Sequence, residues 1–185
     1  MVSKNKSIEN IELVFKNYYQ MMPKELNLSS IKTIIFDNIF WETTFFKWIN
    51  ILFNEFEQSL PDVLINKKSF SLSFEIVDNF IISDLNQKWL HKSGPTDVLS
   101  FPIVSKDDLK NNLTFIELGD IFLSLEVAIK QSNEFNNSIE KEVIWLACHG
   151  FLHLLGWDHQ NQDQLDNMLE IQDYLISNLN LDFIK

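Results

Sequence analysis

Apolar residues recur three and four positions apart in several segments of this 185-residue chain, a spacing that predicts amphipathic helices. Pro23 and Pro61 follow two of these segments, as expected where a helix ends. A third segment is apolar on almost every side, so we expect a central, buried helix there. The helices are predicted at residues 8–22, 42–60, 83–90, 125–135, 138–155 (the buried one) and 163–179.

Other segments are short and apolar or alternate between apolar and polar residues, which is typical of strands. The clearest alternation runs from Phe70 to Ile76, where serines and a glutamate occupy the intervening positions. A polar stretch at 105–113 is predicted to be a flexible loop. Helices and strands in one chain of this length, with 45% hydrophobic residues, predict a single α+β domain spanning 1–185. The strands are predicted at residues 31–40, 69–77, 96–101 and 114–124.

The buried helix leads into eleven residues, His149 to His159, that hold three of the four histidines. Because His149 and His153 are four residues apart, a helix projects their rings from one face, about one turn apart. Gly156 is a natural place for the helix to stop. The chain can then turn back and bring His159 beside the other two rings.

Three imidazoles form a ligand set that suits zinc. A lone histidine in an apolar helix is more often a core or surface residue, but three histidines around a helix stop favour a metal site. Three protein ligands leave a fourth position open, which marks a catalytic rather than a structural ion. We therefore predict one zinc ion at His149, His153 and His159. Asp158 is expected to orient an imidazole, with proton acceptance as its other possible role.

The net charge of −11 argues against attraction of nucleic acid or anionic membrane to the whole surface, although a local basic groove remains compatible with it. All 15 basic residues are lysine. Any phosphate contact must therefore be made without the bidentate guanidinium fork of arginine.

The single cysteine, Cys148, excludes an internal disulfide and fits a reducing compartment. A Cys148–His149 nucleophile is disfavoured because adjacent helical residues point in different directions. Residues 1–10 are polar, with no apolar signal-peptide region after them, and no apolar run is long enough to cross a bilayer. We expect a soluble protein of the cytoplasm.

The string from His149 to His159 resembles the metal signature of the YbeY endoribonucleases, the rRNA-maturation factors of bacteria and organelles. Three further segments match the family in order and spacing, over about residues 30–180. Residues 1–30 look like an N-terminal helical extension outside a core of residues 31–180. The matching segments are Leu85-Asn86, Pro95 to Pro102, and Leu118 to Ile121.

The resemblance implies a mixed four-stranded sheet packed with helices, zincin-like, with zinc in a cleft beside the sheet. The four predicted strands agree in number. The resemblance also implies that His149, His153 and His159 bind zinc and that the chain cleaves single-stranded RNA. Small-subunit rRNA maturation and ribosome quality control are the implied processes, with RNA and ribosomal proteins as partners. The implied location is the cytoplasm or the interior of an organelle.

The chain departs from the family at Leu90, where the family has an arginine after its Leu-Asn motif. Lys88, His91 and Lys92 lie nearby in the sequence. We predict that one or more of them takes over the phosphate contact, as a point charge rather than a fork.

Two other functions fit part of the pattern. A zinc metallopeptidase also places two histidines four residues apart, but it needs a glutamate where this chain has Gly150, and a longer spacing to the third histidine. A metal-stabilised module that binds RNA or a ribosomal protein without cutting is the other hypothesis, because the family arginine is missing.

For the nuclease, either a zinc-bound water or the RNA 2′-hydroxyl serves as the nucleophile.

Overall fold

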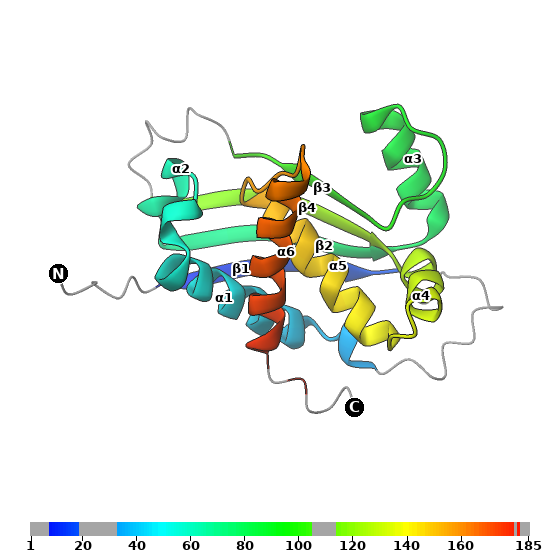
Figure 1. Cartoon of the computed structure of the whole chain (residues 1–185), viewed down its shortest axis with the longest axis horizontal. Helices are drawn as coiled ribbons and strands as arrows, with labels where there is room; N and C mark the ends of the chain where they lie inside the picture. Colours follow the sequence, from blue (N-terminus) through cyan, green and yellow to red (C-terminus); the bar gives the residue numbers. More distant parts are fainter. Residues whose placement is uncertain (1–7, 19–32, 105–113, 180, 182–185) are drawn as a thin grey trace.

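The computed structural model describes residues 8–18, 33–104, 114–179 and 181, which form one four-stranded sheet with helices packed against it (Figure 1). The strand order is β1-β2-β4-β3; β1, β2 and β4 run parallel, and β3 runs antiparallel to β4. The predicted α+β class and mixed sheet are therefore confirmed. The predicted loop at 105–113 lies outside the described residues.

Most helices and strands lie close to their predicted positions. The strands are β1 (Asn10–Asn17), β2 (Ser69–Val77), β3 (Val98–Pro102) and β4 (Phe115–Ser124). The longer helices are α1 (Asn38–Glu55), α3 (Asn79–Leu90), α4 (Leu125–Glu134), α5 (Ile139–Leu154) and α6 (Gln162–Ser177). The short elements are η3 (Thr33–Phe36), η4 (Glu57–Ser59) and α2 (Asp62–Ile65).

The first strand shows that the helix predicted over residues 8–22 is wrong. Residues 10–17 form β1, which pairs in parallel with β2 along its whole length. Ile11 is buried in the core, whereas Val14, on the other side of the strand, is exposed. The apolar residues of this segment fit both a helical and an alternating period, and pairing with β2 selects the alternating one. The described part of the supposed helical extension therefore belongs to the sheet, and residues 19–32 lie outside the described residues.

The strand predicted over residues 31–40 is also wrong. Residues 33–36 form the 3-10 turn η3, and α1 begins directly after Asp37. The carboxylate of Asp37 accepts a hydrogen bond from the Phe40 backbone N–H at 2.7 Å, an N-cap that stabilises the helix start. The sheet has four strands as predicted, but β1 takes the place of this one.

Aromatic packing joins α1, the sheet and α5 into one core. The ring of Phe45 in α1 lies 5.6 Å from that of Phe74 in β2 and 5.2 Å from that of Phe151 in α5. A smaller cluster of Val77, Ile82 and Leu99 packs α3 against the sheet. Among the described residues, none of the helices combines the length and the apolarity needed to cross a bilayer.

Truncation of Ile11 tests the place of β1 in the core. Ile11→Ala leaves a cavity at a side chain that is only 2% exposed, so we expect the free energy of unfolding to fall by about 2–5 kcal/mol in urea denaturation. Val14→Ala, at a side chain on the same strand that is 54% exposed, should change it by no more than about 0.5 kcal/mol. Equal effects of the two substitutions would contradict this position of β1.

Candidate metal centre

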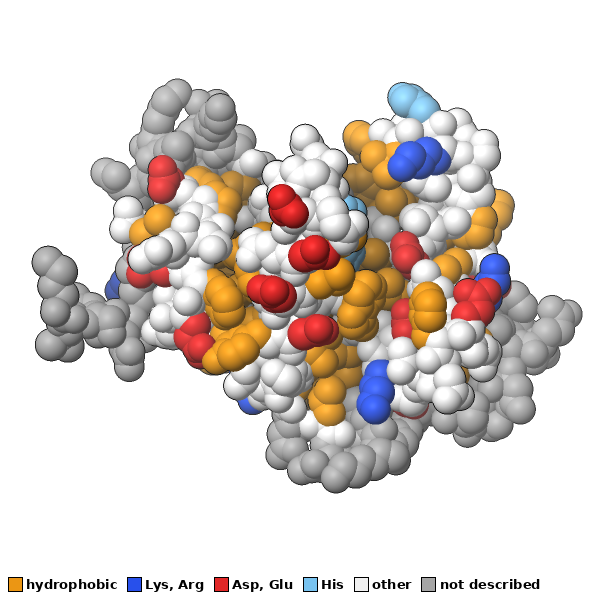
Figure 2. Space-filling view, viewed as in Figure 1, with side chains coloured by type: hydrophobic (Ala, Val, Ile, Leu, Met, Phe, Trp, Pro, Cys, Tyr) orange, Lys and Arg blue, Asp and Glu red, His pale blue; other side chains and the backbone are white. Residues whose placement is uncertain are grey.

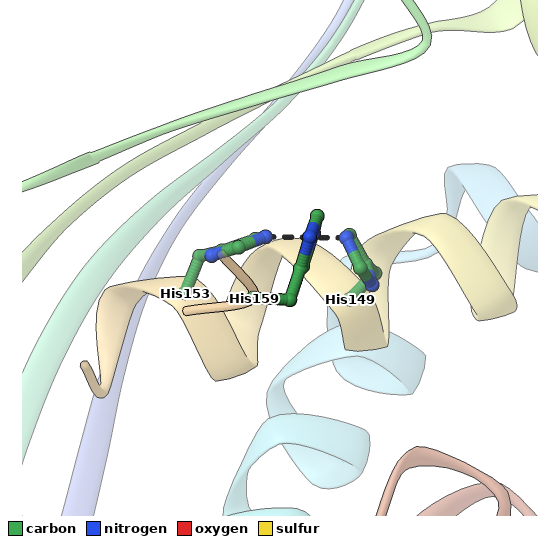
Figure 3. A group of neighbouring side chains, drawn as sticks. All are labelled: His149, His153 and His159. Atoms are coloured by element: carbon green, nitrogen blue, oxygen red, sulfur yellow. Dashed lines mark hydrogen bonds between the residues drawn. The ribbon is translucent and has the colours of Figure 1, made fainter. Parts of the chain in front are cut away.

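Two histidines of α5 and one from the turn after it point toward one another (Figure 3). One ring nitrogen from each of His149, His153 and His159 lies within 4.8 Å of the other two. The Nε2 atoms of His149 and His153 are 3.1 Å apart. The ring centroid of His159 is 5.5 Å from that of His149 and 5.3 Å from that of His153. The structure thus brings the three predicted ligands together.

The chain reversal at Gly156 is what brings His159 to the other two rings. At the end of α5, the Gly156 N–H donates to the His153 carbonyl and the Trp157 N–H to the Leu152 carbonyl, both at 3.1 Å. This pair of bonds is a Schellman motif, which needs a left-handed residue after the helix. Gly156 has a φ of +97°, which residues with a side chain rarely adopt. The predicted helix stop is confirmed.

Two hydrogen bonds orient the imidazoles of α5. His153 Nδ1 lies 2.8 Å from the Trp157 carbonyl oxygen, and His149 Nδ1 lies 3.1 Å from Oε1 of Gln172 in α6. Gln172 is fully buried, and its Nε2 donates to the Trp145 carbonyl at 3.1 Å, which fixes the orientation of the amide. Because both partners are acceptors, both Nδ1 atoms carry the hydrogen. The two Nε2 atoms therefore present lone pairs.

The donor set fits a zinc ion. Two lone pairs 3.1 Å apart repel each other unless a cation lies between them. Zinc with tetrahedral geometry and Zn–N distances of 2.0–2.1 Å holds its nitrogens about 3.3 Å apart. The His149–His153 separation is close to that value. The ring nitrogens of His149, His153 and His159 could therefore hold one ion with little rearrangement.

Burial favours the neutral form of the two α5 imidazoles. It is the main cause that lowers the pKa of His149 and that of His153, and the neighbouring His149 lowers the pKa of His153 further. Neutral imidazole is the form that binds a metal. Both rings are therefore ready to act as ligands at neutral pH.

Asp158 acts on the backbone of His159 rather than on a ring. Its Oδ1 accepts the His159 N–H at 2.8 Å, and its Oδ2 accepts from Nε2 of Gln160 at 3.2 Å. Both bonds lower the pKa of Asp158, and the bond from the His159 N–H has the larger effect. A lower pKa makes the carboxylate a weaker proton acceptor. The ring contacts predicted for Asp158 are made by Trp157 and Gln172, which sequence reasoning missed. Gln172 is 23 residues from its histidine, so no local motif marks it.

The histidines line a cleft of about 860 Å³ between α5, the turn after it and the α3–β3 wall. Figure 2 shows histidine atoms deep between α6 and α3. Lys92 and Leu90 line the cleft. Lys88 forms an ion pair with Asp84 at 2.7 Å, and neither Lys88 nor His91 is among the described residues that line the cleft. Of the three predicted phosphate contacts, the geometry favours Lys92.

The space around Gly150 disfavours the peptidase chemistry. A Cβ at this position would lie 3.0 Å from side-chain atoms of Val98, Ser100 and Ile121. A glutamate here would run into β3 and β4 instead of reaching the histidines. Cys148 is fully buried, and burial raises the pKa of its thiol well above the usual value, so it is a poor nucleophile.

A family model and two sequence relatives point to one family. The family model described as Endoribonuclease YbeY matches residues 35–180. A Prochlorococcus marinus protein from strain MIT 9515, named Endoribonuclease YbeY, is 52% identical over 180 residues, which cover 97% of this chain and 99% of that protein. The protein of the same name from strain MIT 9312 is 53% identical over 172 residues, or 92% and 95% of the two chains. The solution structure of TM1509 from Thermotoga maritima covers 90% of this chain and 87% of its own, with 23% identity and a TM-score of 0.49.

Replacement of Gln172 tests its role in orienting His149. Gln172→Leu keeps the approximate volume but removes the acceptor from Nδ1, so we expect the zinc affinity to fall about 10–100-fold, measured by competition with a chromogenic chelator. The control is Gln162→Leu, on an exposed residue of the same helix whose amide donates to Asp166. An unchanged affinity in Gln172→Leu would contradict the orienting role.

Proposed function

This chain belongs to the YbeY endoribonuclease family, and from that premise we propose that it is a zinc-dependent endoribonuclease specific for single-stranded RNA. We propose small-subunit rRNA as its substrate, in rRNA maturation and ribosome quality control. The observation that carries the proposal is the convergence of three histidine nitrogens in an open cleft. Ribosomal proteins are the further partners we propose, and the cytoplasm, or the stroma or matrix of an organelle, is the proposed location.

His149, His153 and His159 would hold the ion. Zinc bound there would polarise a phosphoryl oxygen or lower the pKa of a bound water. The chain supplies the orientation: Gln172 acts on one imidazole, the Trp157 carbonyl on a second. Asp158 holds the backbone that presents the third ligand.

Lys92 is the residue we propose for the phosphate contact. It lines the cleft together with Leu90, the position at which the family pattern has arginine. A lysine attracts a phosphate as a compact point charge and does not fix its orientation as a guanidinium does. Orientation of the RNA must therefore come from other contacts in and around the cleft.

The ends of the RNA products distinguish the two possible nucleophiles. A 2′,3′-cyclic phosphate shows attack by the RNA 2′-hydroxyl, whereas a 3′-hydroxyl shows attack by water. Family membership supports a nuclease over the peptidase and the non-cutting module, and the closed space at Gly150 adds to the case against the peptidase.

Loss of one ligand tests the role of the metal. His153→Ala should purify with little bound zinc and should cleave a single-stranded rRNA fragment at least about 100-fold more slowly, because the ion contributes several kcal/mol to the transition state. Zinc content per mole and the cleavage rate are measured on the same preparation. The matched control is His91→Ala, which should keep both. Full cleavage by metal-free protein would refute zinc dependence.

Removal of Lys92 tests the phosphate contact. Lys92→Ala should weaken binding of single-stranded RNAs of different sequence to a similar extent and should reduce the slope of log K against log salt by about 0.7. Lys88→Ala removes the same charge from a lysine paired with Asp84, so its slope should stay close to that of the unmodified chain. The assignment fails if Lys88→Ala changes the slope and Lys92→Ala does not. Fluorescence anisotropy at several salt concentrations provides the slopes.

A further inference from the structure

A second hollow, of about 410 Å³, lies beside the cleft, and Trp145 lines both. The Trp145 indole is nearly parallel to the His149 imidazole, with an interplanar angle of 6° and ring centroids 5.6 Å apart. A group that contacts Trp145 in this hollow would be one side chain away from His149, a proposed metal ligand. The hollow is therefore well placed to hold a part of the RNA next to the bond that is cut.

The walls of the hollow suit a flat ligand with apolar faces and polar edges. Its volume lies within the range of small-ligand sites, about 300–1,000 Å³. Aromatic and aliphatic side chains form most of the lining, with a few polar groups among them. The apolar residues are Phe135, Ile144, Trp145, Ile176 and Leu181, and the polar ones are Asn137, Lys141 and Glu142.

Glu142 defines which polar edge fits. The residue is only 5% exposed, and its Oε2 lies 3.5 Å from Nδ2 of Asn137, at the long limit of a hydrogen bond. Burial is the main cause that raises the pKa of Glu142. A buried carboxylate is stabilised when N–H donors replace the water it has lost. Because an ionised carboxylate only accepts hydrogen bonds, the ligand must offer donors.

We propose that this hollow is a base-recognition subsite that takes an unpaired guanine of the RNA substrate, stacked on Trp145 and hydrogen-bonded to Glu142. The inference rests on the proposed ribonuclease function and deepens it. Guanine is the RNA base whose Watson–Crick edge offers two adjacent donors, N1–H and the N2 amino group, to one carboxylate. Adenine and cytosine place an acceptor nitrogen beside their amino group, and uracil places carbonyls on both sides of its imino group. Stacking of an unpaired base on an aromatic side chain is a general mode of single-strand binding.

Each cavity offers one lysine to a strand that passes from one to the other. Lys92 lines the cleft beside the carboxylates of Asp97 and Asp158, and Lys141 lines the hollow beside Glu142, so the phosphates of such a strand have a cation at each cavity. Acidic side chains gather along the outer face of α6 (Figure 2), which disfavours a path over that helix. These exposed residues are Asp163, Asp166, Glu170 and Asp173.

The test measures base preference in binding. Labelled hexanucleotides of 2′-O-methyl uridine, with one central guanine, adenine, cytosine or uracil, are titrated with the zinc-loaded full chain by fluorescence anisotropy, and electrophoresis checks that they stay intact. We expect the guanine oligonucleotide to bind about tenfold more tightly than the other three. Glu142→Gln should abolish most of this preference, because its amide group opposes one of the two guanine donors with a donor.

Two further variants separate the subsite from general effects. Glu134→Gln removes the same charge from an exposed residue of α4 that pairs with Lys130, and it should keep the preference. Ile176→Trp fills the hollow and leaves Glu142 and the histidines in the sequence, so it should also abolish the preference. It serves as the test if Glu142→Gln proves poorly folded. Equal affinity of the unmodified chain for all four oligonucleotides overturns the proposal. A guanine preference that persists in folded Ile176→Trp also overturns it.

Cleavage is measured separately, on unmodified RNAs of the same four sequences. Absence of zinc-dependent cleavage counts against the proposed ribonuclease function. Cleavage with equal binding of all four sequences counts against the guanine subsite alone. The two failures are therefore distinguishable.

Discussion

The site depends on how closely α5 approaches the sheet. At Gly150 the helix lies so near β3 and β4 that a Cβ would meet three side chains at 3.0 Å, and the Ser100 hydroxyl donates to the Gly150 carbonyl at 2.9 Å. This contact fixes the rotation of α5 about its axis. Because residues four apart share a face of a helix, the same rotation presents His149 and His153 together to the cleft. The contact at Gly150 thus determines both how α5 packs on the sheet and where His149 and His153 point.

The rest of the centre is held by elements on either side of that helix. The Schellman turn supplies both the reversal that returns His159 and the Trp157 carbonyl that orients His153. Helix α6 supplies Gln172, whose amide links the backbone of α5 to the ring of His149. A ligand set held in this way needs little reorganisation when an ion binds, which favours affinity and a defined geometry.

Sequence reasoning located the parts of the structure that local chemistry determines. The spacing of the histidines, the helix stop at Gly156 and the alternation in β2 each depend on neighbouring residues, and the structure agrees with them. Sequence reasoning failed where residues distant in the sequence determine the structure. Residues 10–17 become strand β1 through pairing with β2, and Gln172 contacts His149 only after α6 packs on α5. Sequence proximity did not distinguish among Lys88, His91 and Lys92. Of the three, only Lys92 lines the cleft.

The position of Cys148 has a consequence for the durability of the centre. Zinc sites built from thiolates lose their metal when oxidants convert the sulfur to sulfenic acid or to a disulfide. Here the proposed ligands are all imidazoles, and the only thiol of the chain is fully buried beside His149 and held in its protonated form. Peroxide therefore finds no sulfur among the proposed ligands to attack, and a metal held by these three imidazoles would not be lost through sulfur oxidation.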